Sequence, residues 1–197
     1  MNSAMEALLP AFGDAKPAAP DALLLAGCRA GDRSAFEELY RAHGASMKSV
    51  AANVLGDLAE AEDAVQDAFV KIFRSAASFE GRSRFSTWIY RVVVNCCYDR
   101  LRRRRPTVSL DDAAEPSRAP AAESPDPALR RALEQGLAAL PARQRSAFVL
   151  FAVEGFSHRE IAEILDVSPG NSKTLVFDAK RRLARFLEAP RRPEAAR

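Results

Sequence analysis

Cysteine, histidine and long apolar runs are scarce in this chain of 197 residues. The three cysteines, Cys28, Cys96 and Cys97, follow neither a C-x-x-C nor a Cys/His spacing, which argues against a disulfide framework and against a zinc site. The two histidines, His43 and His158, lie far apart in sequence. No apolar run approaches the roughly 18 residues that a membrane span requires. We therefore expect no metal, no cofactor and no membrane insertion.

Signals of catalysis and of secretion are also missing. The chain has no Gly-rich phosphate loop, no nucleophile elbow and no cluster of Asp, Glu, His or Cys on a predicted pocket, so we expect no catalytic residues. Residues 1–6 (MNSAME) lack the positive region of a signal peptide, which predicts a cytoplasmic protein. A composition of 48% hydrophobic and 28% charged residues is typical of a globular chain that buries a core.

The net charge of +3 conceals a strong segregation of charge along the chain. Residues 57–80 carry six acids and two bases, whereas residues 81–105 carry eight arginines and the single acid Asp99. Residues 106–127 are again acidic, with five acids and Arg118, and residues 173–197 hold eight bases and three acids. Two basic blocks separated by an acidic one favour two polyanion-binding surfaces on two modules.

Proline marks the boundary between these modules. Residues 106–127 contain five prolines and five alanines, and proline removes helix and sheet hydrogen bonds, so we expect a flexible, acidic, Pro/Ala-rich linker. Residues 1–20 and 189–197 are expected to be tails. The fold class that follows is all-α, with two small helical domains at residues 21–105 and 128–188, and a helix-turn-helix in the second.

Helical periodicity accounts for the first module. We expect a helix at residues 21–29 and another at residues 59–75. Between them, one helix begins with an N-cap at Ser34, where Glu37 completes a capping box, and a following helix ends near Gly56. The core stripe of the helix at 59–75 comprises Ala64, Val65, Ala68, Phe69, Ile72 and Phe73. Its second face comprises Asp63, Gln66, Asp67, Val70 and Arg74. A solvated polar face and a protein-binding surface both fit this second face.

A longer helix is expected at residues 83–105. The residues predicted to face its core are Phe85, Trp88, Ile89, Val92, Val93 and Cys96. The opposite, exposed face comprises Thr87, Tyr90, Arg91, Val94, Asn95 and Tyr98, and it leads into Arg100 and the arginines at 102–105. Aromatic rings stack on unpaired bases, an amide binds base edges and guanidinium groups pair with phosphates, so this face favours single-stranded nucleic acid.

The second module is expected to form helices at residues 129–140, 144–154, 158–165 and 169–187. Ser157 and Glu160 form a capping box, and Ser168 is followed by Pro169 at the first helical position. The last two helices, joined by a tight turn, form a helix-turn-helix. Its second helix directs Asn171, Lys173, Thr174 and Phe177 toward the major groove, with Lys180, Arg181, Arg182 and Arg185 nearer the phosphates.

Five segments of the chain resemble one protein family. Residues 62–74 (EDAVQDAFVKIFR), 85–95 (FSTWIYRVVVN) and 99–104 (DRLRRR) are similar to the second region of bacterial extracytoplasmic-function (ECF) sigma factors. Residues 140–145 (LPARQR) and 154–170 (EGFSHREIAEILDVSPG) are similar to their fourth region. The resemblance covers roughly residues 21–188, in the order typical of the family.

The resemblance implies a partner or a DNA element for each surface. The face at Asp63, Gln66, Asp67, Val70 and Arg74 is expected to dock on the clamp helices of core RNA polymerase. The helix at 88–95 and the loop at 79–86 are expected to melt the −10 element and capture a flipped base, in a pocket to which Asn95 contributes. The residues expected at single-stranded −10 DNA are Phe79, Arg82, Arg84, Thr87, Tyr90, Arg91, Asn95, Tyr98 and Arg102.

The same resemblance implies that the second module binds the duplex −35 element. Its expected contacts are Asn171, Lys173, Thr174, Phe177, Lys180 and Arg181, and the resemblance implies that the module also touches the polymerase flap. The acidic linker would run toward the RNA exit path, and an anti-sigma factor is an expected further partner. Leu175 and Asp178 depart from the family pattern, which has basic residues near these positions, and fewer phosphate contacts predict a weaker dependence of binding on salt.

Two other functions remain open from the residues alone. A helix-turn-helix regulator that binds duplex operators as a dimer explains residues 157–187, but neither the acidic face at 63–74 nor the aromatic and basic helix at 87–105. A nucleic-acid-modifying enzyme would need a catalytic constellation that the sequence does not offer.

Overall fold

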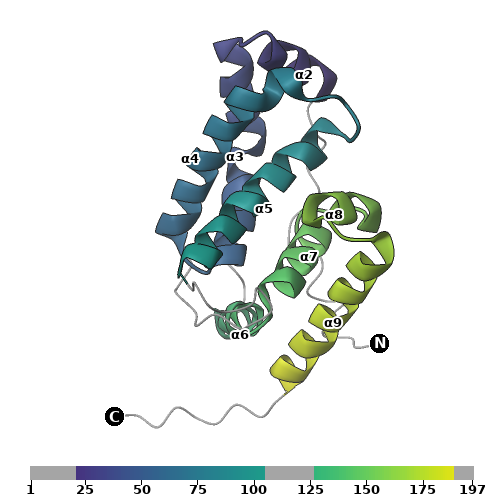
Figure 1. Cartoon of the computed structure of the whole chain (residues 1–197). Coiled ribbons are helices and arrows are strands. Elements are labelled where there is room, and N and C mark those ends of the chain that lie inside the picture. The colour runs from purple at the N-terminus through teal and green to yellow at the C-terminus, as the bar shows by residue number, and fades with distance from the viewer. Residues whose placement is uncertain (1–20, 105–126, 189–197) are drawn as a thin grey trace.

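The computed structural model describes residues 21–104 and 127–188 (Figure 1). Every regular element in these two ranges is a helix, with eight α-helices and one short 3-10 helix, so the predicted all-α fold is confirmed. The predicted tails, and the predicted linker apart from its last residue, lie outside the described residues.

The first module consists of α2 (Asp21–Arg29), α3 (Arg33–Leu55), α4 (Leu58–Ser75), the 3-10 helix η2 (Ala76–Ser78) and α5 (Phe85–Arg104). Helices α3, α4 and α5 pack against one another, and α2 lies across one end of the three (Figure 1). Their fully buried side chains include Leu39, Met47, Ile72 and Ile89. A left-handed Gly56 ends α3, and the Asp57 carboxylate caps α4 by accepting from the Glu60 amide, which turns the chain back on itself.

The expected start of α3 was wrong by two residues, and its expected interruption does not occur. Asp32, not Ser34, is the N-cap, because its carboxylate accepts from the Ser34 amide at 2.9 Å and carries a charge that favours the positive helix end. Glu37 instead pairs with Arg33 at 3.2 Å. One helix of 23 residues runs from Arg33 to Leu55, whereas two successive helices had been expected, the second ending near Gly56.

The second module consists of α6 (Pro127–Ala138), α7 (Ala142–Ala152), α8 (His158–Leu165) and α9 (Pro169–Glu188). Leu133 and Leu137 of α6 pack with Leu183 of α9. The predicted capping box is confirmed, since the Ser157 amide donates to the Glu160 carboxylate while the Ser157 hydroxyl accepts from the Glu160 amide. The predicted helix-turn-helix is therefore formed by α8 and α9.

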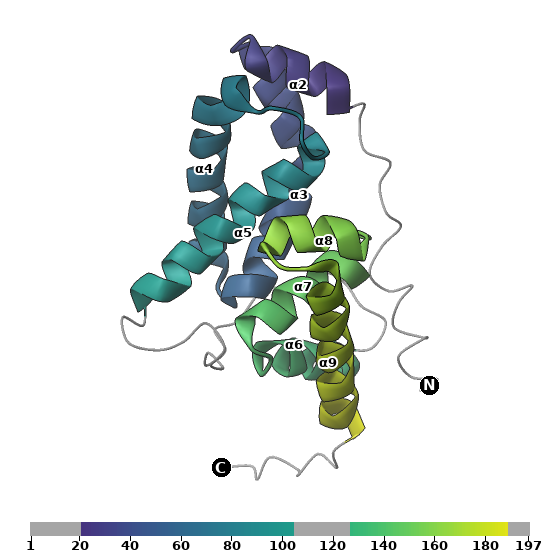
Figure 2. The same ribbon diagram turned by 45° about the vertical axis from the view of Figure 1, so that its right-hand side comes forward.

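The two modules share one continuous core. Helix α7 packs against α3, and α8 packs against α5 (Figure 2). Leu150 of α7 and Ile161 of α8 belong to the same buried cluster as Val54 of α3 and Ile89 of α5. Apolar burial between the modules therefore holds α8 in place on α5.

Arg145 of α7 connects the modules through its guanidinium group. This side chain is only 2% exposed, and its Nη2 donates to the carbonyl of Val54 at the end of α3, at 2.8 Å. Its Nη1 donates to the carbonyl of Ala138 at the end of α6, at 3.2 Å. Helix C-terminal carbonyls carry partial negative charge, so a buried cation is well placed between two of them.

Replacing this arginine should weaken the whole assembly. We expect Arg145→Met to lower the free energy of unfolding by about 3 kcal/mol, because it leaves buried carbonyls without a charged donor. Urea unfolding followed by circular dichroism measures this value. The control is Arg143→Met, a half-buried arginine of the same helix. Equal stability of the two variants would contradict the role given to Arg145.

Candidate protein and nucleic-acid interfaces

One side of α4 is exposed and mixes charged with apolar side chains. Asp63, Gln66, Asp67, Val70 and Arg74 all lie on this exposed side, and half of the Val70 surface is accessible. An exposed valine among carboxylates is typical of a surface that binds another protein. We call these five residues the α4 face.

The acids of the α4 face are held by α5. Arg100 of α5 pairs with Asp67 at 2.8 Å and with Asp63 at 3.5 Å. Both carboxylates remain more than half exposed, so the pairs orient them without removing them from solvent. Such pairs add little stability, but they fix where the negative charge lies.

Aromatic side chains border the α4 face, and one of them, Phe73, was wrongly predicted to lie in the core. Phe73, expected in the core, is 57% exposed and rests on Phe36 of α3 with ring centroids 4.7 Å apart. Phe69 is half-buried and contacts Tyr40 in the same way, at 5.2 Å. By helical spacing Phe73 lies at one edge of the apolar stripe of α4, and its ring remains in solvent.

The predicted core face of α5 is largely right, but its predicted exposed face is not. Phe85, Ile89, Val93 and Cys96 are buried as expected, while Trp88 and Val92 are half-buried. The residues of the expected exposed face that are in fact buried are Thr87, Tyr90, Val94 and Tyr98. Arg91 and Asn95 are the members of that face that do reach solvent.

The second module causes this burial. The Tyr90 hydroxyl donates to the Glu154 carboxylate at 3.1 Å, and its ring meets the edge of Phe156 at 4.9 Å. Residues 87, 90, 94 and 98 recur at helical spacing and are mostly apolar or aromatic, so the sequence held a signal for a second buried stripe. Periodicity does not reveal that the covering element lies some 60 residues further along the chain.

The loop before α5 is anchored by aromatic packing. Phe79 is buried, with its ring 5.1 Å from Trp88 and 5.7 Å from Phe85. The guanidinium of Arg29 in α2 donates to the Phe79 carbonyl and lies over its ring. Phe79 is therefore part of this anchor rather than of an open surface.

Three arginines that were predicted to contact −10 DNA are exposed, two in the loop before α5 and one near the end of α5. Arg82 pairs with Glu80 at 2.6 Å, Arg84 reaches Glu160 of α8 at 3.1 Å, and Arg102 pairs with Asp99 of its own helix. Each guanidinium therefore has a carboxylate partner within the chain.

Helix α9 presents the predicted −35 residues to solvent. Asn171, Lys173, Thr174, Phe177 and Arg181 are exposed, and Phe177 is 63% accessible. An apolar ring so exposed on a basic helix is suited to contact a thymine methyl group in a major groove.

Contacts within the second module hold α9 on the rest of the domain. The hydroxyl of the buried Ser172 lies 3.2 Å from the Nδ1 of His158, which links the start of α9 to the start of α8. Lys180 is half-buried, and its ammonium group lies 4.7 Å from the centre of the Phe151 ring, against α7 rather than fully in solvent. Lys180 therefore also serves the packing of α9 on α7.

The two departures in α9 have structural explanations. Leu175 is half-buried and packs against the core, where an arginine would have to extend toward solvent. Asp178 pairs with Arg181 at 3.0 Å, and the Arg181 guanidinium also lies over the Phe177 ring. The acid therefore orients a neighbouring base on the exposed face.

Burial where the modules meet changes the titration of Glu154 and Tyr98, among other groups. Burial raises the pKa of Glu154 above its ordinary value, although the hydrogen bond from Tyr90 acts in the opposite direction. Burial also raises the pKa of Tyr98 to about 12. The charged form of Glu154 is thus disfavoured where the modules meet.

Residues 21–104 and 127–188 contain no group of His, Cys, Asp and Glu that could hold a metal ion. None of the helices in these ranges is both long enough and apolar enough to cross a membrane. The three cysteines are buried and free.

Two family models match the chain, one for each module. The model for Sigma-70 region 2 matches residues 39–107, and the model for Sigma-70 region 4 matches residues 130–183. The ECF RNA polymerase sigma factor SigM of Mycobacterium tuberculosis is 38% identical over 169 residues, which cover 85% of this chain and 84% of SigM. The RNA polymerase sigma factor CarQ of Myxococcus xanthus is 35% identical over 148 residues, covering 74% of this chain and 84% of CarQ.

Solved structures show the same fold. The sigma factor RpoE of Bartonella quintana, in complex with the anti-sigma factor NepR, is 26% identical with a TM-score of 0.64, covering 79% of this chain and 98% of that one. CnrH, in complex with the cytosolic domain of CnrY, is 23% identical with a TM-score of 0.65, covering 87% of this chain and 99% of that one.

The raised pKa of Glu154 predicts a pH dependence of stability. A carboxyl group whose native pKa lies above its unfolded value contributes most at low pH and loses that contribution as pH rises through the native pKa. We therefore expect the difference in unfolding free energy, wild type minus Glu154→Gln, to increase as pH falls from 8 to 5. Urea unfolding at several pH values measures it, and taking the difference cancels the other titrating groups. A difference that does not change with pH would refute the shift.

Proposed function

The chain belongs to the ECF family of RNA polymerase sigma factors, and on that premise we propose how its two modules divide the work of transcription initiation. A sigma factor binds core RNA polymerase, directs it to a class of promoters and helps to open the duplex. We assign residues 21–105 to polymerase docking and to the −10 element, and residues 128–188 to the −35 element. The proposal rests most directly on the match of both family models, in the order region 2 then region 4.

The α4 face is the proposed polymerase-docking surface. Its support is the combination of Val70 with oriented carboxylates and Arg74 on one exposed side. An apolar contact surrounded by charges provides affinity at its centre and orientation at its rim.

The proposed −10 surface comprises the loop before α5 and the outward side of that helix. Arg82, Arg84, Arg91 and Arg102 would pair with phosphates, and Asn95 would bind a base edge. The remaining proposed contacts, Phe79, Thr87, Tyr90 and Tyr98, are buried in the described arrangement. Thr87 and Tyr90 would reach DNA once α8 and the turn before it move away.

The proposed −35 surface is the exposed side of α9. Asn171, Thr174 and Phe177 would contact base edges, while Lys173, Lys180 and Arg181 would bind phosphates. The pairing of Asp178 with Arg181 reduces the charge available there, which supports the expectation of a weak salt dependence.

We propose that the chain carries out no covalent chemistry of its own, since its partners supply the polymerase activity. We propose that it acts in the cytoplasm, where RNA polymerase and promoter DNA are located. Control by an anti-sigma factor is also proposed, on the likeness to a sigma factor solved with the anti-sigma factor NepR.

A single change on the α4 face tests polymerase docking. We expect Val70→Glu to weaken binding to bacterial core RNA polymerase about tenfold or more, because it places a charge at the apolar centre of the contact. Biolayer interferometry with immobilised core enzyme measures the affinity. Leu23→Glu on α2 is the matched control, since Leu23 is also an exposed aliphatic residue, and it should bind as wild type does. Equal weakening by both changes, or by neither, would count against the docking surface.

Two changes on α9 test the −35 surface with different signatures. Lys173→Ala should lower the slope of log affinity against log salt by about one, because one phosphate contact is lost. Phe177→Ala should weaken binding and leave that slope unchanged, because the ring carries no charge. The holoenzyme and a promoter identified by transcription mapping provide the binding assay. If both variants altered the slope equally, or neither altered binding, the assignment of α9 would be wrong.

A further inference from the structure

Asp178 lies near the middle of the exposed side of α9. Asn171, Thr174 and Arg181 stand seven residues before it, four before it and three after it, a spacing that brings their side chains onto the same helix face. The buried residues of α9 occupy the opposite side: Ser172, Val176, Ala179 and Leu183. These three neighbours of Asp178 all belong to the proposed −35 surface, to which Asp178 itself has not been assigned.

An acid at this position is exceptional within α9. The helix carries five bases, Lys173, Lys180, Arg181, Arg182 and Arg185. Its acids are Asp178 and the last residue, Glu188. Phosphates repel a carboxylate, so an acid on a DNA-binding helix weakens binding wherever it meets the backbone. Asp178 is tolerated without that loss only in the middle of the major groove, where base edges and not phosphates are its neighbours.

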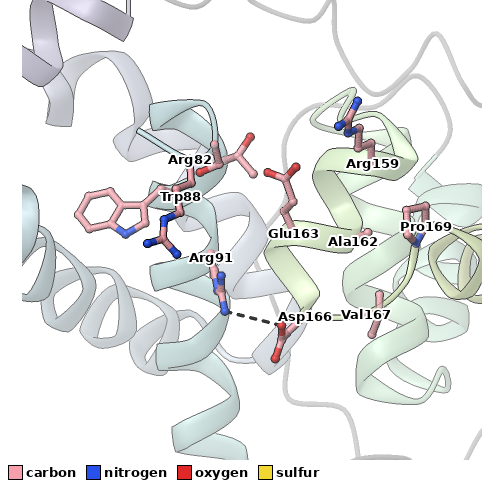
Figure 3. A pocket seen from close by; sticks show the side chains of 11 residues that line it. Arg82, Trp88, Arg91, Arg159, Ala162, Glu163, Asp166, Val167 and Pro169 are labelled. Atoms are coloured by element: carbon pink, nitrogen blue, oxygen red, sulfur yellow. Dashed lines mark ion pairs between the residues drawn. The ribbon is translucent and has the colours of Figure 1, made fainter. Parts of the chain in front are cut away.

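Two carboxylates at α8 are turned toward the first module instead. Glu163 lines an interdomain cleft of about 470 Å³, and Asp166 at the end of α8 points across it toward Arg91 (Figure 3). Asp178 pairs within its own helix, with Arg181. Its charge therefore belongs to the exposed side of α9, where a DNA groove would lie.

Arg181 holds the Asp178 carboxylate in a defined orientation. Its Nη2 donates to Oδ1 of Asp178 at 3.0 Å, and its guanidinium carbon lies 5.8 Å from the centre of the Phe177 ring. A carboxylate has about four acceptor sites, so one bond from Arg181 leaves others available to a donor from DNA. A guanidinium group has about five N–H donors, so Arg181 can hold Asp178 and still bind a phosphate.

The chemistry of a carboxylate favours one base in the major groove. An ionised carboxylate only accepts hydrogen bonds, and the donors that bases expose in this groove are the N4 amine of cytosine and the N6 amine of adenine. The adenine amine lies between two acceptors, its own N7 and O4 of the paired thymine, whereas the cytosine amine has one neighbouring acceptor, O6 of the paired guanine. Guanine and thymine offer no donor there. A carboxylate is therefore best matched to cytosine.

We propose that Asp178 is a specificity-determining residue of the −35 surface, which accepts a hydrogen bond from the N4 amine of a cytosine while Arg181 holds the carboxylate in place. This inference rests on the proposed function and deepens its −35 part. An arginine or lysine at this position would favour guanine, so the acid gives the chain a different −35 preference. The pair of Asp178 and Arg181 thus contributes to base readout as well as lowering the positive charge of α9.

Base preference at each −35 position tests the role of Asp178. The holoenzyme, formed from core RNA polymerase and the full chain, binds a duplex library in which the −35 element of a mapped promoter is randomised, and the bound DNA is sequenced. We expect the wild type to favour cytosine at one position by about tenfold. Asp178→Asn should favour adenine at that same position, because an amide bonds both N6 and N7 of adenine. Asp178→Ala should lose the preference there.

Glu163→Gln is the matched control, since it also removes one carboxylate of the helix-turn-helix, but from the cleft and not from α9. It should keep the wild-type preference at every position. Preferences at the remaining −35 positions should survive both Asp178 changes, because α9 stays folded and bound. A pair that only stabilises the helix predicts the same preferences for the wild type and both Asp178 variants, and that result would overturn the proposal. A uniform gain in affinity for all sequences would overturn it too, because Asp178 would then only repel phosphates.

Failure of the proposed function has a different signature. If the wild type did not bind core polymerase, the sigma-factor activity itself would be refuted and the role of Asp178 with it. If the holoenzyme selected −35 sequences but favoured cytosine at none of their positions, the −35 surface would stand and the specificity role of Asp178 would fall.

Discussion

The described structure depends on one buried arginine. Arg145 places its guanidinium between the last turns of α3 and α6, where it satisfies carbonyls that both helices would otherwise leave without donors. The group is charged and buried, so its position tolerates little movement before those bonds are lost. Arg145 thereby fixes the contact between α7 and α3, and α8 follows α7 onto α5, where apolar burial holds it.

A second constraint is the chain's own negative charge. Several arginines that the family resemblance assigns to DNA already have a carboxylate partner: Arg84 with Glu160, Arg91 with Asp166, and Arg181 with Asp178. The acidic block at 57–80 and the basic block at 81–105 meet in space at Arg100, which pairs with Asp63 and Asp67. Exposed pairs of this kind are weak and exchangeable.

Local signals in the sequence predicted much of the fold. The capping box at Ser157 and Glu160 involves residues three apart, and so it could be identified without any tertiary information. The exposed side of α4 followed from helical spacing in the same way. The N-cap of α3 was predicted at Ser34 alone and was missed, because the capping-box spacing of Ser34 and Glu37 does not show that the Asp32 carboxylate accepts from the Ser34 amide.

Tertiary contacts account for what could not be predicted. A solvent-facing stripe and a second buried stripe look alike in one helix, so Thr87, Tyr90 and Tyr98 were assigned to solvent although the second module covers this side of α5. Phe73 was assigned to the core because periodicity gives direction but not depth. The roles of individual DNA contacts stay predictions, since they concern partners rather than packing.

Family membership weighs against both alternatives that the residues left open. A stand-alone operator-binding regulator explains the helix-turn-helix but not the match of residues 39–107 to Sigma-70 region 2, and an enzyme explains neither module. Run-off transcription on sheared genomic DNA, with bacterial core polymerase in the presence and absence of this chain, tests the central claim most directly. A sigma factor produces discrete new transcripts whose start sites share −35 and −10 elements. An active core enzyme that gains no transcripts on addition of the chain would contradict the account.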